Sequence, residues 1–152
     1  SPGRPFIPLD RFIDEYQSRN ERLADMMRRF GICEEKGSGI DKVISAAETF
    51  QLPAPDFREG TRRTTAALFA HRALDDMNRA DRVRACYQHC VLRYLFHEPM
   101  SNQTFRERLK LSEDKVATVS QIISATVDAQ MIKLADPNQT STRYRSYIPY
   151  WA

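Results

Sequence analysis

The sequence predicts an α+β protein in two parts. A region of helices and a strand pair comes first, and a region with the order helix, helix, helix, strand, strand follows. Two observations favour this fold class. Apolar residues recur at α-helical spacing in five segments, and two pairs of short β-branched or aromatic runs flank turn residues. A chain of 152 residues suits one ordinary domain or two small ones.

The first expected elements are a loop and two helices. Prolines exclude a regular element at residues 1–8, and residues 9–16 predict a short helix. Asn20 is a typical N-cap and Gly31 a typical stop for a longer helix. The apolar residues of that longer helix, which fall at helical spacing, are Leu23, Met26, Met27 and Phe30.

Another helix and a strand pair complete the first region. The helix opens at Gly37-Ser38-Gly39 and is broken by Pro53. The residues expected on its apolar face are Ile40, Val43, Ile44 and Ala47. Residues 56–58 and 64–70 have the composition of two strands on either side of a turn at Glu59-Gly60.

A polar segment at residues 73–80 is interpreted as a linker between a first region, 1–72, and a second region, 81–152. The second region begins with an amphipathic helix over residues 81–97, which Pro99 ends. Its apolar stripe is Val83, Cys86, Tyr87, Cys90, Val91, Tyr94 and Leu95.

Two more helices and a hairpin follow. Ser101 caps a short helix, and Ser112 caps a longer one that runs to about Gln130. Residues 131–135 and 144–148 have strand composition and bracket a polar tip. Three helices followed by a two-stranded wing is the order typical of a winged helix-turn-helix domain.

Composition narrows the function classes. A chain that is 41% hydrophobic and 28% charged is neither disordered nor collagen-like. No apolar run approaches the roughly 20 residues that cross a bilayer, so no membrane partner is expected. Three cysteines without a Cys-x-x-Cys pair favour a reduced, cytoplasmic setting. The start lacks an initiator Met and a signal pattern, so we expect a C-terminal fragment of a longer protein.

The net charge of +3 is a property of the C-terminal half. Residues 1–79 hold 13 Lys/Arg and 13 Asp/Glu, whereas residues 80–152 hold 10 and 7. This modest excess permits a nucleic-acid partner without requiring one.

The helix after Ser112 is the one that can enter a major groove of DNA. Its candidate contact residues are Lys115, Thr118 and Gln121, and Ser124 shares their face. Gln pairs with adenine, Thr meets a thymine methyl, and Lys holds guanine or phosphate. The same helix also carries acidic residues, which do not suit DNA. An alternative therefore stays open, in which this domain mediates dimerisation or another protein contact without nucleic acid.

The predicted hairpin supplies candidate phosphate contacts. Arg143 and Arg145 alternate along one strand, Lys133 lies on the other, and Tyr144 and Tyr147 are interleaved with them. Charged residues on an exposed edge strand also protect it from pairing with another chain. Both explanations fit the pattern.

Two further clusters have structural explanations. Cys86, His89 and Cys90 could share a metal ion, but both cysteines fall on the apolar stripe, so we expect core positions and no metal site. The aromatic end, residues 147–152, is expected to fold back on the helix over residues 81–97; left exposed, it would be an association surface.

Three stretches resemble a known family. They are Arg19-Asn20, the block GICEEKGSGI (31–40) and the strand EGTRRTTAALF (59–69). They resemble the C-terminal region of bacterial Schlafen AlbA-type regulators, also described as RecG-like transcriptional regulators. This resemblance covers residue 1 to about 70, and the closing YIPYWA looks like the winged-helix tail of the same regulators. The first block is similar in turn to the later half of a GHKL-type ATPase domain.

The resemblance implies a partial GHKL-like region followed by a winged helix, in a transcriptional regulator that binds DNA, with a homodimer as one arrangement. Gly37, Ser38 and Gly39 would match a glycine box that contacts a nucleotide phosphate; a tight loop into a helix explains the same residues. The family's magnesium-binding Asn and neighbouring Glu have no counterpart in these residues. We therefore expect no enzyme activity and no cofactor, with ATP bound only by a longer protein.

Overall fold

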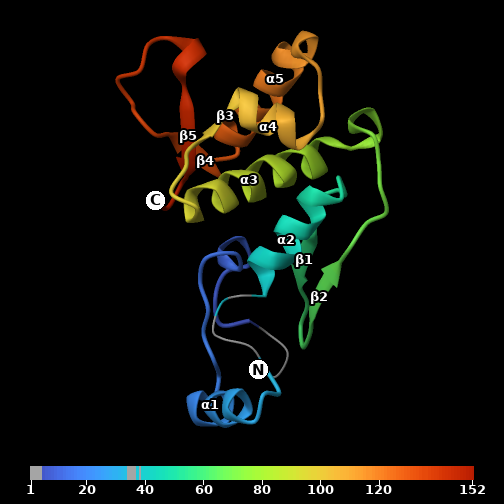
Figure 1. The fold of residues 1–152 in the computed structure, drawn as a ribbon, viewed down its shortest axis with the longest axis vertical. Coiled ribbons are helices and arrows are strands. Elements are labelled where there is room, and N and C mark those ends of the chain that lie inside the picture. Colours follow the sequence, from blue (N-terminus) through green and yellow to red (C-terminus); the bar gives the residue numbers. More distant parts are fainter. Residues whose placement is uncertain (1–4, 34–36, 38) are drawn as a thin grey trace.

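The computed structural model describes residues 5–33, 37 and 39–152 and has a mixed α+β fold (Figure 1). Its α-helices are α1 (Glu21–Arg29), α2 (Ile40–Thr49), α3 (Arg79–Leu95), α4 (Asn102–Arg108) and α5 (Val116–Asp128). Its strands are β1 (Asp56–Glu59), β2 (Thr64–Ala67), β3 (Met100–Ser101), β4 (Ile132–Leu134) and β5 (Ser146–Pro149). Its 3-10 helices are η1 (Leu9–Arg11), η2 (Leu74–Asp76), η3 (Glu113–Lys115) and η4 (Thr142–Tyr144).

The strands form two small antiparallel sheets. β1 pairs with β2, with Asp56 opposite Ala67. The other sheet has the order β3-β5-β4, so the C-terminal strand lies in the middle, with Met100 opposite Tyr147 on one side and Ile132 opposite Pro149 on the other. The central strand β5 also packs against α3, which anchors the C-terminal end of the chain in the fold.

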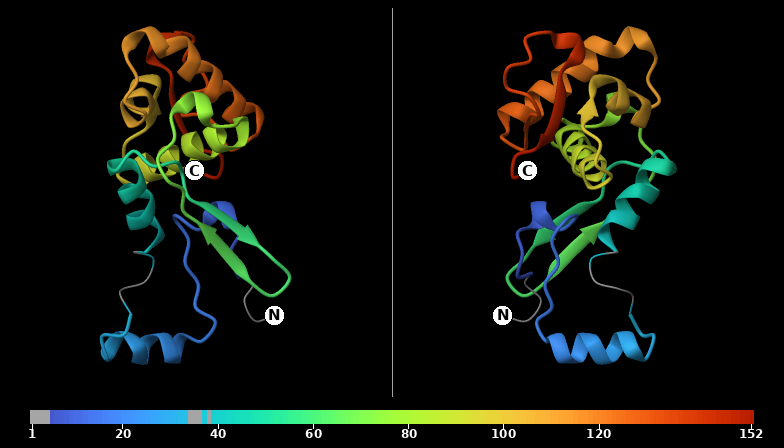
Figure 2. Two further views of the ribbon diagram at one scale, coloured as in Figure 1. Left: turned by 90° about the vertical axis from the view of Figure 1, so that its right-hand side faces the viewer. Right: turned by 60° about the vertical axis from the view of Figure 1, so that its left-hand side comes forward.

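Helix α1 lies apart from the rest of the chain, as both views of Figure 2 show. Its predicted N-cap is confirmed: the Leu23 amide donates to Asn20 Oδ1 at 3.0 Å. The predicted stop, Gly31, has a φ of +68°, which glycine adopts without strain. The apolar face, however, is largely uncovered, since Met26 is 55% and Phe30 73% exposed.

The core is one apolar cluster around α3. Cys86, Cys90 and Val91 of α3 are fully buried, which confirms the cysteines as core residues. Ile44 of α2 and Phe105 of α4 belong to the same cluster. The core therefore includes side chains from both sides of residues 73–80, and the division of the chain there stays a prediction.

The aromatic end of the chain folds back on α3, as expected. The Trp151 ring meets Tyr94 edge-on, with the ring centroids 5.5 Å apart. The indole Nε1 donates to the Tyr87 hydroxyl at 3.3 Å, and the Arg11 guanidinium lies 4.1 Å from the Trp151 ring centroid. Packing, not an exposed association surface, accounts for this tryptophan.

Several boundaries differ from the sequence prediction. Residues 9–16 contain only the short helix η1, and α3 begins at Arg79, within the segment expected to be a linker. The helix after Ser112 starts as η3 and becomes α-helical at Val116. Strand β3 was not expected, because two residues are too few to produce a period. Within the described residues, no helix combines the length and apolar character of a membrane span.

Candidate nucleic-acid interface

Helix α5 is held by its buried face and by α4. Val119 and Ile123 point into the core at 0% and 2% exposure. The Asn102 side-chain amide donates to the Val116 carbonyl at 3.1 Å and to Ser120 Oγ at 2.9 Å. These contacts set how α5 lies against α4 and the core, and its opposite face is exposed to solvent.

Reciprocal capping bonds fix the start of α4. Ser101 Oγ accepts from the Thr104 amide at 3.2 Å, and Thr104 Oγ1 accepts from the Ser101 amide at 3.0 Å. This capping box satisfies two backbone donors that the first turn of a helix would otherwise leave free. The prediction that Ser101 caps this helix is confirmed.

The candidate contact residues on α5 divide into two groups. Gln121 and Ser124 are exposed, together with the small residues Ala117 and Ser120. Thr118 is half-buried, on the flank that faces α3. Between Ala117 and Ser124 the exposed side chains of α5 are uncharged and mostly small, which leaves the backbone there open to close approach. Asp128, at the end of the helix, is exposed and acidic.

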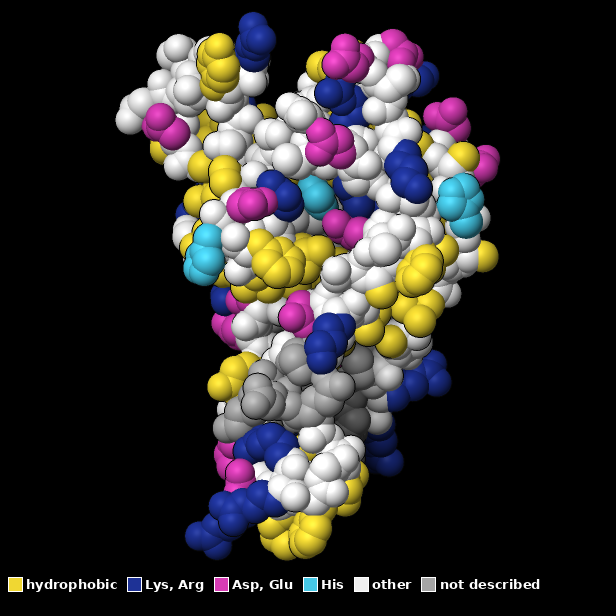
Figure 3. Space-filling view, viewed as in Figure 1, with side chains coloured by type: hydrophobic (Ala, Val, Ile, Leu, Met, Phe, Trp, Pro, Cys, Tyr) yellow, Lys and Arg dark blue, Asp and Glu magenta, His cyan; other side chains and the backbone are white. Residues whose placement is uncertain are grey.

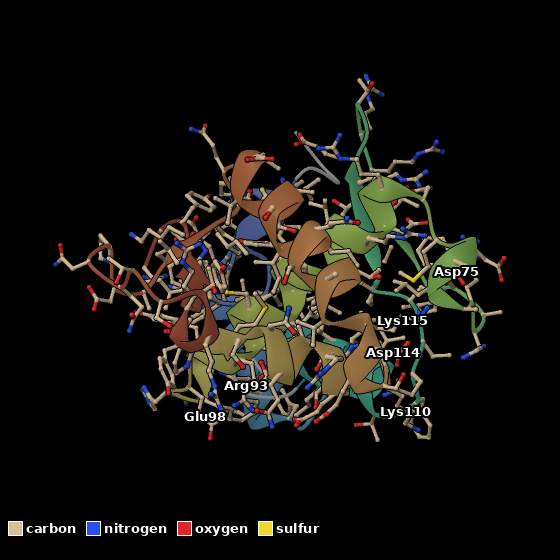
Figure 4. The ribbon with its side chains drawn as sticks, turned by 90° about the horizontal axis from the view of Figure 1, so that it is seen from above. Asp75, Arg93, Glu98, Lys110, Asp114 and Lys115 are labelled. Carbon is tan, nitrogen blue, oxygen red and sulfur yellow. The ribbon has the colours of Figure 1, made fainter. Side chains whose placement is uncertain are left out.

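Lys115 lies on η3, where the chain enters α5, and is exposed. Figure 4 shows Lys115 beside Asp114 and Lys110 at this end of the helix. The hydrogen bond from the Ser112 hydroxyl to the Asp114 carboxylate keeps the pKa of Asp114 below its ordinary value. At neutral pH the Asp114 carboxylate carries a negative charge, which partly offsets the positive charge of Lys115 and Lys110 at the start of α5.

The three cations predicted for the hairpin lie in different settings. Lys133 is on β4, as expected, and its Nζ donates to the Ala152 carbonyl at 2.5 Å. Arg143 is exposed in η4, with its guanidinium 5.8 Å from the Tyr144 ring centroid. Arg145 is half-buried, and its Nε has no hydrogen-bond partner within the described part of the chain.

The predicted alternation of Arg143 and Arg145 along a strand is wrong. Residues 142–144 form a 3-10 turn, and β5 starts only at Ser146. In Figure 3, a notch separates the β4–β5 loop (residues 135–145) from the turn between α4 and α5, and Lys or Arg side chains occur on both lobes.

A groove of about 460 Å³ separates the first turn of α3 from the flank of α5. Thr118 and Gln121 line it from α5, and Arg79 and Arg82 line it from α3. Neither arginine was predicted from the sequence as a candidate contact residue. Only the packing of α3 on α5 brings them beside residues nearly forty positions away, and no spacing in the sequence signals that packing.

The glycine segment before α2 is described in part. Gly37 has a φ of +81°, and Gly39 is the N-cap of α2; Ser38 lies outside the described residues. Among the residues that the structure describes, no atom lies within 4 Å of a side chain placed at Gly39, so their packing does not require glycine there. Open space at a helix start is compatible with an anion approaching the backbone N–H groups.

Comparison with known protein families gives a match to the N-terminal region of the chain. Residues 1–68 match the family described as "Putative ATP-dependent DNA helicase recG C-terminal". No curated protein and no solved structure matches the chain. The match includes α1, α2, β1 and β2 and ends before α3. The N-terminal region of the chain is thus similar to the RecG C-terminal family, in agreement with the RecG-like resemblance of its sequence.

Proposed function

We propose that residues 79–152 form a winged helix that binds DNA, within the C-terminal part of a bacterial transcriptional regulator of the Schlafen AlbA type. The observation that carries the proposal is topological. The chain runs α3-β3-α4-α5-β4-β5, and the sheet order is β3-β5-β4. In a winged helix the third helix enters the major groove, and the loop of the hairpin reaches the neighbouring backbone.

In the proposed complex α5 is the element that enters the major groove. Its small outward residues, Ala117, Ser120 and Ser124, allow the helix to approach the base edges closely. Gln121 is the side chain best suited to a base, because its amide can donate and accept at adenine. The rigid attachment of α5 to α4 through Asn102 holds this side chain in register with the DNA.

Phosphate contacts complete the proposed interface. Lys115 is at the entry to α5 and Arg143 at the β4–β5 loop, and both are exposed. Lys133 and Arg145 are weaker candidates, because Lys133 donates to the Ala152 carbonyl and Arg145 is half-buried. Phosphate contacts position the protein and supply affinity that falls with salt.

A protein-interaction module is the second candidate function, and a specific observation favours it. Large apolar side chains are exposed on elements away from α5, including Phe30 after α1, Phe50 after α2 and Phe96 after α3, at 73%, 72% and 66%. Exposed apolar surface of this kind is typical of association sites. A mass that rises with concentration, together with no DNA binding, would favour this alternative, in which the chain forms a homodimer or holds a protein partner.

The N-terminal region is proposed to contribute no enzyme activity in this chain. The glycine segment offers backbone N–H groups to a phosphate, and the open space at Gly39 fits that contact. Residues Gly37, Ser38 and Gly39 would hold one nucleotide phosphate when a longer protein supplies the rest of the site. The chain itself is proposed to need no cofactor and to act in the cytoplasm.

The test is a fluorescence-anisotropy titration of the protein against random-sequence duplex DNA at 50 and 200 mM salt. Binding at low salt that weakens steeply at high salt is the expected result, because Lys115 at the entry to α5 and Arg143 on the loop would displace counterions. Arg143→Ala should weaken binding, and Arg22→Ala on α1, which removes the same charge far from α5, should not. Absence of binding at 50 mM salt would refute the proposed DNA function.

A further inference from the structure

We propose that the groove between α3 and α5 seats a phosphate of the DNA backbone, with Arg79 as the cation that holds it. The inference rests on the proposed DNA-binding function and extends it to a helix that the sequence analysis did not include in the site. The groove, of about 460 Å³, lies directly beside Gln121, the proposed base-reading side chain.

The two arginines of the groove have different roles. The Arg82 guanidinium donates to the Leu74 carbonyl at 3.1 and 2.8 Å, so it is held in place as a wall of the groove. Arg79 is exposed, and no hydrogen bond or ion pair joins it to any residue that the structure describes. Its guanidinium is therefore available to a ligand.

Three other arginines of α3 and α4 differ from Arg79, because each forms an ion pair with a carboxylate. Arg84 pairs with Asp81, Arg93 with Glu98, and Arg108 with Glu48. Asp75 and Asp76 on η2 precede the groove, so Arg79 and Arg82 must offset their charge for an anion to bind there. An arginine also suits the phosphate itself, because the guanidinium donors match the geometry of phosphate oxygens.

The position of Thr118 favours contact with a DNA phosphate over contact with a base. Thr118 is half-buried on the groove flank of α5, whereas the exposed outward face holds Gln121 and Ser124. Its hydroxyl can donate to a phosphate oxygen that sits between α3 and α5. The inference therefore reassigns Thr118 from a thymine contact to a backbone contact, and leaves Gln121 at the border between backbone and bases.

A phosphate in this groove would fix how deeply α5 enters the major groove. Backbone contacts set the register of a protein on DNA but carry no sequence information themselves. Contacts from the first turn of α3, from Lys115 and from Arg143 would hold α5 from three directions, and Gln121 would then meet the same base position in each complex.

The experiment measures the salt dependence of binding for wild type, Arg79→Ala, Arg79→Lys and the matched control Arg22→Ala, on four unrelated duplexes. Loss of one phosphate contact lowers the slope of log affinity against log salt by about one. The affinity advantage of wild type over Arg79→Ala should therefore shrink about three- to fourfold between 50 and 200 mM salt, equally on all four duplexes. Arg79→Lys should keep the wild-type slope, and Arg22→Ala should match wild type.

Thr118→Val supplies a second test, because it removes the hydroxyl and keeps the side-chain volume. It should weaken binding to the four duplexes by the same factor. A change in preference among them would overturn the assignment of Thr118 to the backbone. Equal melting temperatures of all variants establish that the effects concern binding.

The outcomes separate the two proposals. If wild type binds and Lys115→Ala weakens binding while Arg79→Ala has the slope of Arg22→Ala, the groove holds no phosphate and the DNA function stands. If wild type does not bind any duplex at 50 mM salt, both the proposed function and this inference are wrong.

Discussion

Glu48 should be essential for the attachment of α2 to the rest of the fold. Its carboxylate lies 3.0 Å from His89 Nδ1 of α3 and 3.3 Å from Arg108 Nε of α4. The Arg108 side chain is only 5% exposed. Burial lowers the pKa of Arg108 and the charge of Glu48 opposes that effect, so the guanidinium depends on this carboxylate.

The magnitude follows from what the substitution leaves behind. Breaking a buried ion pair costs about 3–5 kcal/mol, because one charge stays buried without compensation. Glu48→Ala should fall at the lower end, about 3 kcal/mol, since the Arg108 guanidinium keeps its bond to the Leu52 carbonyl at 2.7 Å. Glu48→Gln keeps the shape and loses the charge, so it should cost about 2 kcal/mol, within the range measured for charged hydrogen bonds.

The assay is urea unfolding followed by circular dichroism at neutral pH. With a slope of about 2 kcal/mol per molar urea, a loss of about 3 kcal/mol lowers the midpoint by about 1.5 M. Glu98→Ala is the matched control: it breaks the pair with Arg93, but the Glu98 side chain is 53% exposed, so the loss should stay under about 1 kcal/mol. Equal midpoints for Glu48→Ala and Glu98→Ala would refute the reasoning.

Two further predictions concern the cysteines and the start of α4. Burial raises the pKa of the Cys86 thiol to about 12 and also raises that of Cys90, whereas Cys33 is exposed. Iodoacetamide at pH 7.5 should therefore add to one thiol of the native protein and to three thiols after denaturation, as measured by intact mass. Rapid addition to two or three thiols of the native protein would contradict the burial of Cys86 and Cys90. Ser101→Ala removes the capping box and should lower the free energy of unfolding by about 1 kcal/mol. The control Ser124→Ala, on the exposed face of α5, should change the free energy of unfolding little. Equal urea midpoints for the two variants would show that the cap does not stabilise α4.

The sequence predicted the elements whose signals are local. The caps at Asn20 and Ser101 depend on residues within one helical turn, and both are found in the structure. The apolar stripe of α3 is found in part: Cys86, Tyr87, Cys90 and Val91 are buried, whereas Tyr94 and Leu95 at its end are exposed. The aromatic end at Trp151 was also correctly expected to pack on α3, because a small fold needs its apolar area.

The features that the sequence did not reveal depend on distant residues. The Glu48 cluster joins side chains of α2, α3 and α4; Glu48 and His89 are 41 positions apart, and no periodicity connects them. The Arg79 groove exists only because α3 packs on α5. The exposure of Phe30 could not be predicted either, because helical spacing identifies an apolar face and not what covers it.

In the proposed function, α5 and the β4–β5 loop form the DNA surface. Backbone amide chemical-shift mapping during titration with a duplex can locate that surface residue by residue, and a protein of 17.6 kDa is well suited to this measurement. We expect the shifts to concentrate in residues 115–124 and in the β4–β5 loop, with the amides of α1 unchanged. Shifts confined to α1 and α2, or no shifts at saturating DNA in low salt, would contradict it.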